Sequence, residues 1–162
     1  MLTSIAQFSQ IWRSESEATA RVLEALTDAS LAQRVTSRDR SLGDIAWHVA
    51  TSIPEMMSWT KIRVAGGDHH APTPFSAGAI REAYAQAATS LLEQVSREWT
   101  DETLRVEDEM YGERWPRGLT LQALVFHEIH HRGAMTVLMR QAGLTVPGVY
   151  GPNREETEAM KT

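Results

Sequence analysis

Residues 127–131 carry two histidines with the spacing of a metal-binding pair on a helix. His127 and His131 lie four residues apart, in a segment whose apolar periodicity predicts an amphipathic helix. Side chains at positions i and i+4 lie one above the other on a helix, so both imidazoles can contact one metal ion. The same segment also reads H-E-x-x-H, the zinc-peptidase pattern in which the glutamate, here Glu128, acts as general base.

A third nitrogen ligand is available at His48, which falls in the apolar stripe of a different predicted helix. Considered alone, it would be interpreted as a core histidine with one hydrogen bond. Three buried imidazoles without a ligand, however, would leave ring nitrogens unpaired, at about 1–3 kcal/mol for each. We therefore predict that His48, His127 and His131 bind one ion. Three nitrogen ligands and one open position are typical of a catalytic site, and nitrogen ligation favours zinc, nickel or iron over magnesium and calcium.

The other histidines are not predicted to be ligands. His130 is rotated by about 100° around the helix from His131, which indicates a surface or supporting position. His69 and His70 belong to a loop rich in glycine and proline, where they are expected to be solvated.

The peptidase interpretation lacks a third ligand. The extended form of that motif needs a glycine and a further histidine downstream, where this chain has Ala134 and Val137. Glu155 and Glu156 lie beyond a Pro/Gly break. Glu128 should point away from an ion inside the bundle and lie at the surface.

Four amphipathic helices must position these residues. The first is capped by Thr3 or Ser4 and runs to about Ala29, and the second runs from Ser41 to about Val64 with Pro54 inside it. The third begins after Ser76 and extends toward Trp99. Residues 100–118 form a long connection with a short hairpin around Met110, Tyr111 and Gly112. The fourth helix is capped by Thr120 and ends near Gly143.

This pattern predicts an all-α fold, an up-and-down four-helix bundle with a long crossover between helices three and four. The 162 residues form a single domain, with residues 145–162 as an extended tail.

Composition narrows the functional classes. The net charge is −5 and no basic cluster is present, so no nucleic-acid partner is expected. Cysteine is absent, which excludes thiolate ligands and a cysteine nucleophile. No segment reads as a signal peptide or a membrane span, and we expect a cytoplasmic protein without a membrane partner.

Several motifs together resemble the DinB-like (DinB/YfiT) superfamily. They are the segment 43–50 around His48, the His127-x-x-x-His131-Arg132-Gly133 element, residues 139–143, and the tail sequence 146–152. The likeness covers residues from about 40 to 156. It implies a bundle with a long crossover, a metal site formed by His48, His127 and His131, and frequent homodimerisation. Characterised members use the metal to activate a low-molecular-weight thiol.

Three functional hypotheses follow. The first is a metal-dependent thiol S-transferase that acts on a small-molecule substrate, with a coordinated thiol attacking as thiolate. The second is a hydrolase that uses metal-bound hydroxide. The third is a non-catalytic bundle in which the metal holds helices together. Arg132 is interpreted as a surface ion-pair partner or a helper at the site, and Gly133 as a point of close helix or subunit approach. Tyr111 and Trp115 are candidates for a pocket mouth.

Overall fold

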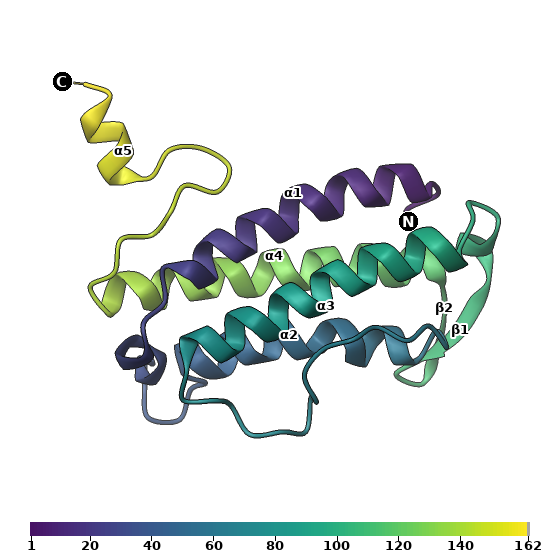
Figure 1. Cartoon of the computed structure of the whole chain (residues 1–162), viewed down its shortest axis with the longest axis horizontal. Coiled ribbons are helices and arrows are strands. Elements are labelled where there is room, and N and C mark those ends of the chain that lie inside the picture. Colours follow the sequence, from purple (N-terminus) through teal and green to yellow (C-terminus); the bar gives the residue numbers. More distant parts are fainter. Residues whose placement is uncertain (162) are drawn as a thin grey trace.

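The computed structural model describes residues 1–161, which are mainly helical (Figure 1). The long helices are α1 (Ile5–Glu24), α2 (Leu42–Ser58), α3 (Ala77–Glu98) and α4 (Arg117–Gln141). The short elements are η1 (Asp28–Ala32), η2 (Thr103–Arg105), the strands β1 (Glu107–Met110) and β2 (Glu113–Pro116), and α5 (Arg154–Ala159). The four long helices pack into a bundle in which α1 and α2 each contact α3 and α4. The predicted all-α four-helix bundle is confirmed.

The direction of the helices differs from a strictly up-and-down path. Shortly after α1 ends, η1 meets the starts of two later helices. The N–H of Leu42 donates to the carbonyl of Gln33 (2.7 Å), and the N–H of Ala77 donates to Asp28 (2.7 Å). Helices α2 and α3 therefore start at the same end of the bundle and run parallel (Figure 1). The connection that runs back along the bundle is thus residues 59–76, whereas residues 99–116 join neighbouring helix ends.

The helix starts follow the capping signals in the sequence. Ser4, Ser41 and Ser76 each accept a hydrogen bond from the backbone N–H three residues further on, and Ser41 forms a full capping box with Asp44. Helix α4 is the exception, because it begins at Arg117, directly after Pro116, and not at Thr120. Thr120 is instead completely buried within the first turns of the helix.

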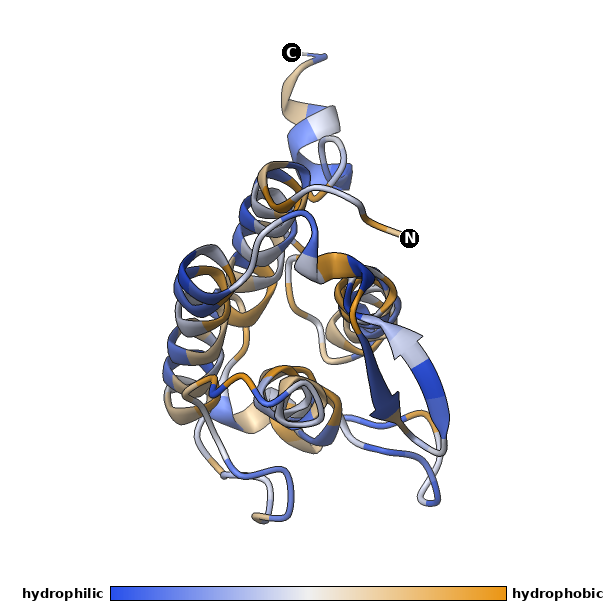
Figure 2. Cartoon of the chain, turned by 90° about the vertical axis from the view of Figure 1, so that its right-hand side faces the viewer, coloured by the Kyte–Doolittle hydropathy of each residue, from blue (hydrophilic) through white to orange (hydrophobic). Residues whose placement is uncertain are grey.

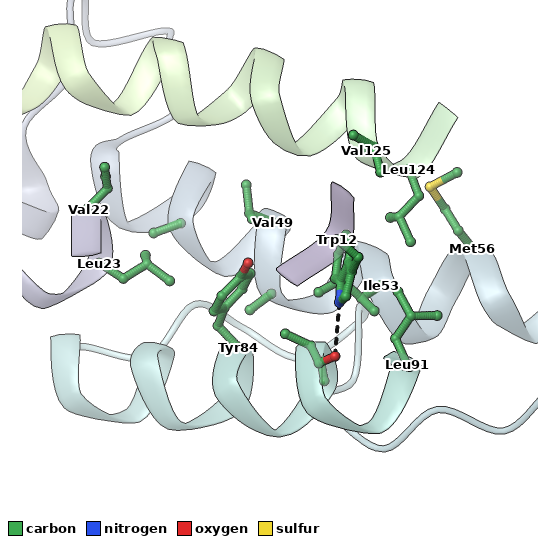
Figure 3. Packing of buried hydrophobic residues seen from close by; sticks show 14 of the residues in the cluster. Trp12, Val22, Leu23, Val49, Ile53, Met56, Tyr84, Leu91, Leu124 and Val125 are labelled. Carbon is green, nitrogen blue, oxygen red and sulfur yellow. Dashed lines mark hydrogen bonds between the residues drawn. The ribbon is translucent and has the colours of Figure 1, made fainter. Parts of the chain in front are cut away.

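Large apolar side chains from all four helices fill the core (Figure 3). Trp12 of α1 is 1 % exposed, and its indole N–H donates to the carbonyl of Ala88 on α3 (3.0 Å). This bond satisfies the one polar group of the largest core side chain and fixes α1 against α3.

The predicted hairpin is present in the connection between α3 and α4. Strands β1 and β2 are antiparallel and are joined at Tyr111 and Gly112, which both have positive φ angles, 52° and 85°. Seen along the bundle, the hydrophilic hairpin lies beside the helices (Figure 2). It is therefore placed to cover one side of the bundle without entering the core.

Two boundaries differ from the sequence prediction. The second helix ends at Ser58, well before Val64, and the chain then turns through Lys61 at a positive φ of 64°. The tail from residue 145 is not entirely extended, because Asn153 and Glu156 form a capping box that starts α5. Figure 1 shows this segment standing away from the bundle.

Candidate metal centre

The structure brings His48, His127 and His131 together between α2 and α4. The Nε2 atoms of His48 and His127 are 3.0 Å apart, and one candidate ligand atom from each histidine lies within 4.8 Å of the others. Two nitrogens bound to zinc at about 2.0–2.1 Å in tetrahedral geometry lie about 3.3 Å apart. The cluster therefore needs only small side-chain rotations to surround one ion, and its donor set suits a transition metal.

A neighbouring hydroxyl selects the tautomer of His48. The Ser52 hydroxyl donates to the carbonyl of His48 (2.7 Å), so its oxygen is free to accept a proton from Nδ1 of the same histidine (3.3 Å). A proton on Nδ1 leaves the lone pair on Nε2, the nitrogen that faces His127. Ser52 lies four residues after His48 on α2, a helical spacing that could have identified it from the sequence.

All three imidazoles are held in the neutral form that a metal requires. Burial, followed by the charges of the neighbouring histidines, lowers the pKa of His48 to about 4, and the pKa of His131 likewise falls to about 4. Burial also lowers the pKa of His127. At neutral pH the lone pairs are therefore available to a metal without the loss of a proton.

These shifts predict how the stability of the metal-free protein depends on pH. Between pH 6.5 and about 4 the unfolded chain binds more protons at these histidines than the folded chain, so the free energy of unfolding falls as the pH falls. Urea unfolding of EDTA-treated protein should show lower stability at pH 4.5 than at pH 7. The His48→Ala variant should show a smaller decrease over that range, and an equal decrease would contradict the assigned shifts.

Glu128 is not at the surface, contrary to the sequence prediction. It is 1 % exposed, and its Oε1 atom accepts hydrogen bonds from Thr19 Oγ1 and the Tyr84 hydroxyl, both at 2.7 Å. These partners belong to α1 and α3, so the carboxyl group points into the bundle on a different face of α4 from His127. Burial raises its pKa. The H-E-x-x-H pattern therefore lacks a glutamate facing the histidines, which removes the basis of the peptidase interpretation.

Arg132 is also buried and lies neither at the surface nor beside the histidines. It is 2 % exposed and forms an ion pair with Glu15, while its Nη1 atom donates to Thr19 Oγ1 (3.1 Å). The hydroxyl of Tyr150, in the tail, accepts from Arg132 (2.6 Å) and donates to Glu15 (2.7 Å). Glu128 and Arg132 together hold one face of α4 against α1, and His127 and His131 consequently face α2.

A cavity of about 420 Å³ opens beside two of the histidines, His48 and His127. Its wall includes Tyr111 and Trp115, as predicted for a pocket mouth, and also Glu55, which the sequence analysis did not single out. Glu55 lies seven residues after His48, two helical turns along the same face of α2.

The loop histidines take different positions. His69 also lines this cavity, and its ring centroid is 5.7 Å from that of His48, so the expectation of a solvated His69 is corrected. The trace of residues 59–76 brings it there, by running back along the bundle beside α2. His70 and His130 are exposed, although the ring of His130 lies 4.9 Å from that of His131.

Gly133 does not mark a close approach between helices of this chain. A Cβ atom added there would meet nothing within 4 Å among the described residues. A groove of about 700 Å³ runs past it, between α4 and the tail, on the side of Arg132 and away from the cavity of the histidines.

Comparison with known proteins gives a consistent relationship. The chain is 42% identical over 156 residues to a Bacillus subtilis (strain 168) protein named "Uncharacterized protein YrdA", covering 96% of this chain and 93% of that protein. A crystal structure of a DinB-like protein from Bacillus cereus ATCC 10987 superposes with a TM-score of 0.89 at 43% identity, covering 93% of this chain and 100% of the other. A second DinB-like protein, YjoA of Bacillus subtilis, shares the fold at 19% identity, with a TM-score of 0.69 over 91% of this chain and 99% of that one.

The search for membrane spans gave none: no helix among the described residues has the length and apolar character to cross a bilayer. The sequence profile of the DinB family matches residues 1–162. With this match and the 42% identical relative, the resemblance seen in the motifs is confirmed: the chain belongs to the DinB family.

Proposed function

We propose that His48, His127 and His131 bind one divalent transition metal ion, and that the protein is a metal-dependent transferase for a low-molecular-weight thiol. The observation that carries the proposal is the meeting of three neutral imidazoles from two helices beside a cavity. Three nitrogen ligands leave a fourth position open. The family implies the same ligand set and the same use of a thiol.

The residues of the chain have separate tasks in this scheme. A bound transition metal would acidify a coordinated thiol, whose pKa is about 8.5 when free, so that it reacts as thiolate at neutral pH. His48, His127 and His131 hold the ion, and Ser52 orients His48. The cavity wall, with Met56, Tyr111 and Trp115, shields the reacting atoms from water and positions the electrophile.

The alternatives receive less support. A hydrolase needs a general base near a metal-bound water, and the glutamate adjacent to His127 is buried on another face of α4. A metal that only joined α2 and α4 would not need an adjacent cavity, and its removal would unfold the bundle. The extensive apolar core predicts instead that the metal-free protein stays folded.

Cobalt substitution tests the proposed function. Protein loaded with Co²⁺ should develop a thiolate-to-cobalt absorption band with 2-mercaptoethanol, and should consume an electrophilic bimane probe faster than the metal-free protein. Circular dichroism should show the same helix content with and without metal. Absence of the band with small thiols would overturn the thiol proposal, and loss of helix content without metal would favour the structural role.

Removing the hydroxyl that orients His48 should weaken the site without destroying it. We expect Ser52→Ala to reduce zinc affinity by about tenfold, because supporting partners of metal ligands typically contribute 10–100-fold. Isothermal titration calorimetry would measure the change. Ser58→Ala, at the exposed end of α2, is the control and should leave the affinity unaltered. Equal affinities for Ser52→Ala and the wild type would exclude the orienting role.

We also infer that the protein forms homodimers through an uncharged face of α4. Its exposed positions are Phe126, His130, Gly133, Val137 and Gln141, which repeat at three- and four-residue intervals. Phe126 and Val137 are 60% and 57% exposed. Glycine inside a helix costs about 1 kcal/mol relative to alanine, and no part of this chain uses the open space at Gly133. In a chain of charge −5, a second copy can pack here without placing like charges together.

A charge placed on this face should abolish the dimer. Val137→Glu should sediment as a monomer at concentrations where the wild type is dimeric, because two copies of the glutamate would be buried near the symmetry axis. Val35→Glu adds the same charge at a position that is 64% exposed and outside α4, and should leave the dimer intact. A monomeric wild type in analytical ultracentrifugation would contradict the inference.

A further inference from the structure

The tip of the β-hairpin carries a residue that the turn itself does not favour. Tyr111 and Gly112 have φ angles of 52° and 85°, a conformation in which two-residue hairpin turns prefer asparagine or aspartate before glycine. For other residues the left-handed region costs about 1 kcal/mol or more. The tyrosine side chain must therefore contribute something that compensates for its backbone.

The side chain of Tyr111 reaches across to α2. Its hydroxyl donates to Glu55 Oε2 (2.7 Å), and its ring lies 5.7 Å from that of Trp59 and 6.2 Å from that of Trp115. The hairpin thus places an aromatic wall at the cavity of the histidines, and the hydrogen bond to Glu55 ties this wall to the helix that carries His48.

Glu55 is held in place by neutral donors only. Its Oε2 atom accepts from Tyr111 and its Oε1 atom accepts from the indole N–H of Trp59 (3.1 Å). Among residues 1–161 it forms no ion pair with an arginine, lysine or histidine. The carboxylate charge is consequently fixed in direction, lines the cavity beside His127, and is not neutralised by the protein.

An unneutralised carboxylate among aromatic rings is a recognisable arrangement. The faces of tryptophan and tyrosine rings attract cations, and a carboxylate adds direct charge attraction and a hydrogen-bond acceptor for ammonium groups. Specificity in small-molecule cavities comes from such a few fixed polar groups within a mainly apolar wall. An anionic group would meet repulsion at the same place.

We propose that Glu55, with Tyr111 and Trp115, forms a subsite that selects ligands carrying a positive charge, such as a primary ammonium group, next to their metal-binding atom. This inference rests on the proposed function, because it assigns a substrate preference to the cavity of the metal centre. Glu55 is a specificity-determining residue in this account, and the electrophile or the thiol that reacts at the site bears the cationic group.

Two small thiols of opposite charge test the proposal directly. Cysteamine carries an ammonium group and 3-mercaptopropionate carries a carboxylate, while 2-mercaptoethanol is neutral. Their binding to the Co²⁺-loaded protein would be followed by the thiolate-to-cobalt band at pH 7. The wild type should bind cysteamine at least about tenfold more tightly than 3-mercaptopropionate, with 2-mercaptoethanol in between.

Glu55→Gln should remove this preference and leave the metal site intact. The amide oxygen of glutamine can still accept the hydrogen bond from Tyr111, so the substitution mainly removes the charge. Its ratio of cysteamine to mercaptopropionate affinity should fall to within about twofold, with Co²⁺ affinity unchanged. Glu82→Gln, which removes the same charge from the exposed surface of α3, should keep the wild-type ratio.

The outcomes separate the two levels of the account. If all three thiols bind the wild type with similar affinity, or if Glu55→Gln keeps the wild-type ratio, the cationic subsite is overturned and the thiol function stands. If none of the thiols gives the band, the thiol function is overturned together with the subsite. A preference present in the wild type and in Glu82→Gln, but lost in Glu55→Gln, supports the subsite.

Discussion

His48→Ala is expected to abolish metal binding to the purified protein. The substitution removes the only ligand supplied by α2 and leaves His127 and His131 as a two-residue pair on α4. We expect zinc affinity to fall by more than about 100-fold, beyond the 10–100-fold typical of losing a supporting hydrogen bond. Isothermal titration calorimetry at pH 7 would give the affinity, and elemental analysis would give the number of ions for each chain.

Two further variants make this result specific. His70→Ala removes an exposed histidine of the loop and should bind zinc like the wild type. Glu128→Gln should also keep zinc affinity, because Glu128 faces α1 and α3 and not the histidine cluster. Retention of tight zinc binding by His48→Ala would contradict the three-histidine site, and a severe loss of binding in Glu128→Gln would restore the peptidase interpretation.

Arg132→Met should cause the largest loss of stability. The arginine is buried and links Glu15, Thr19 and Tyr150. Its removal leaves Glu15, whose side chain is 12% exposed, without the opposite charge. Breaking a buried ion pair in this way costs 3–5 kcal/mol, and partial solvent access of Glu15 places the expected loss near the lower end, about 3 kcal/mol.

Urea unfolding of the metal-free protein would measure this loss. Arg97→Met is the matched control, since its ion pair with Glu98 is exposed and should contribute less than about 1 kcal/mol. A loss below about 1 kcal/mol for Arg132→Met would show that the buried pair is not important for folding. Because the same network fixes the face that α4 presents to α1, Arg132→Met should also weaken zinc binding to His127 and His131.

The sequence was sufficient for the histidine cluster because its geometry is set within helices. The i, i+4 spacing of His127 and His131 and the position of His48 in an apolar stripe are local features, and helical periodicity converts them into directions. The serine caps at the starts of α1, α2 and α3 were predictable for the same reason. A bundle of four such helices then brings the two sets of histidines together.

The errors concern what lies around each helix. Glu128 does point away from the site, as predicted, but its sequence position does not reveal that α1 and α3 cover that face with Thr19 and Tyr84. A buried carboxylate stabilised by hydroxyl groups from distant segments has no local signal. Arg132 was misjudged for the same reason.

The path of the connections was equally hidden. Residues 59–76 and 99–116 are of similar length and irregular composition, and nothing in their periodicity shows which one runs back along the bundle. The parallel arrangement of α2 and α3, and with it the approach of His69 to the cavity, follows from contacts between segments remote in sequence. Such contacts are decided by packing of the whole chain.

The most direct test of the metal centre is a crystal structure of the zinc-loaded protein, with diffraction recorded on both sides of the zinc absorption edge. The account predicts one strong anomalous peak for each chain, within about 2.0–2.1 Å of a ring nitrogen of His48, His127 and His131. A peak elsewhere, or a His48 ring turned away from the ion, would contradict the account.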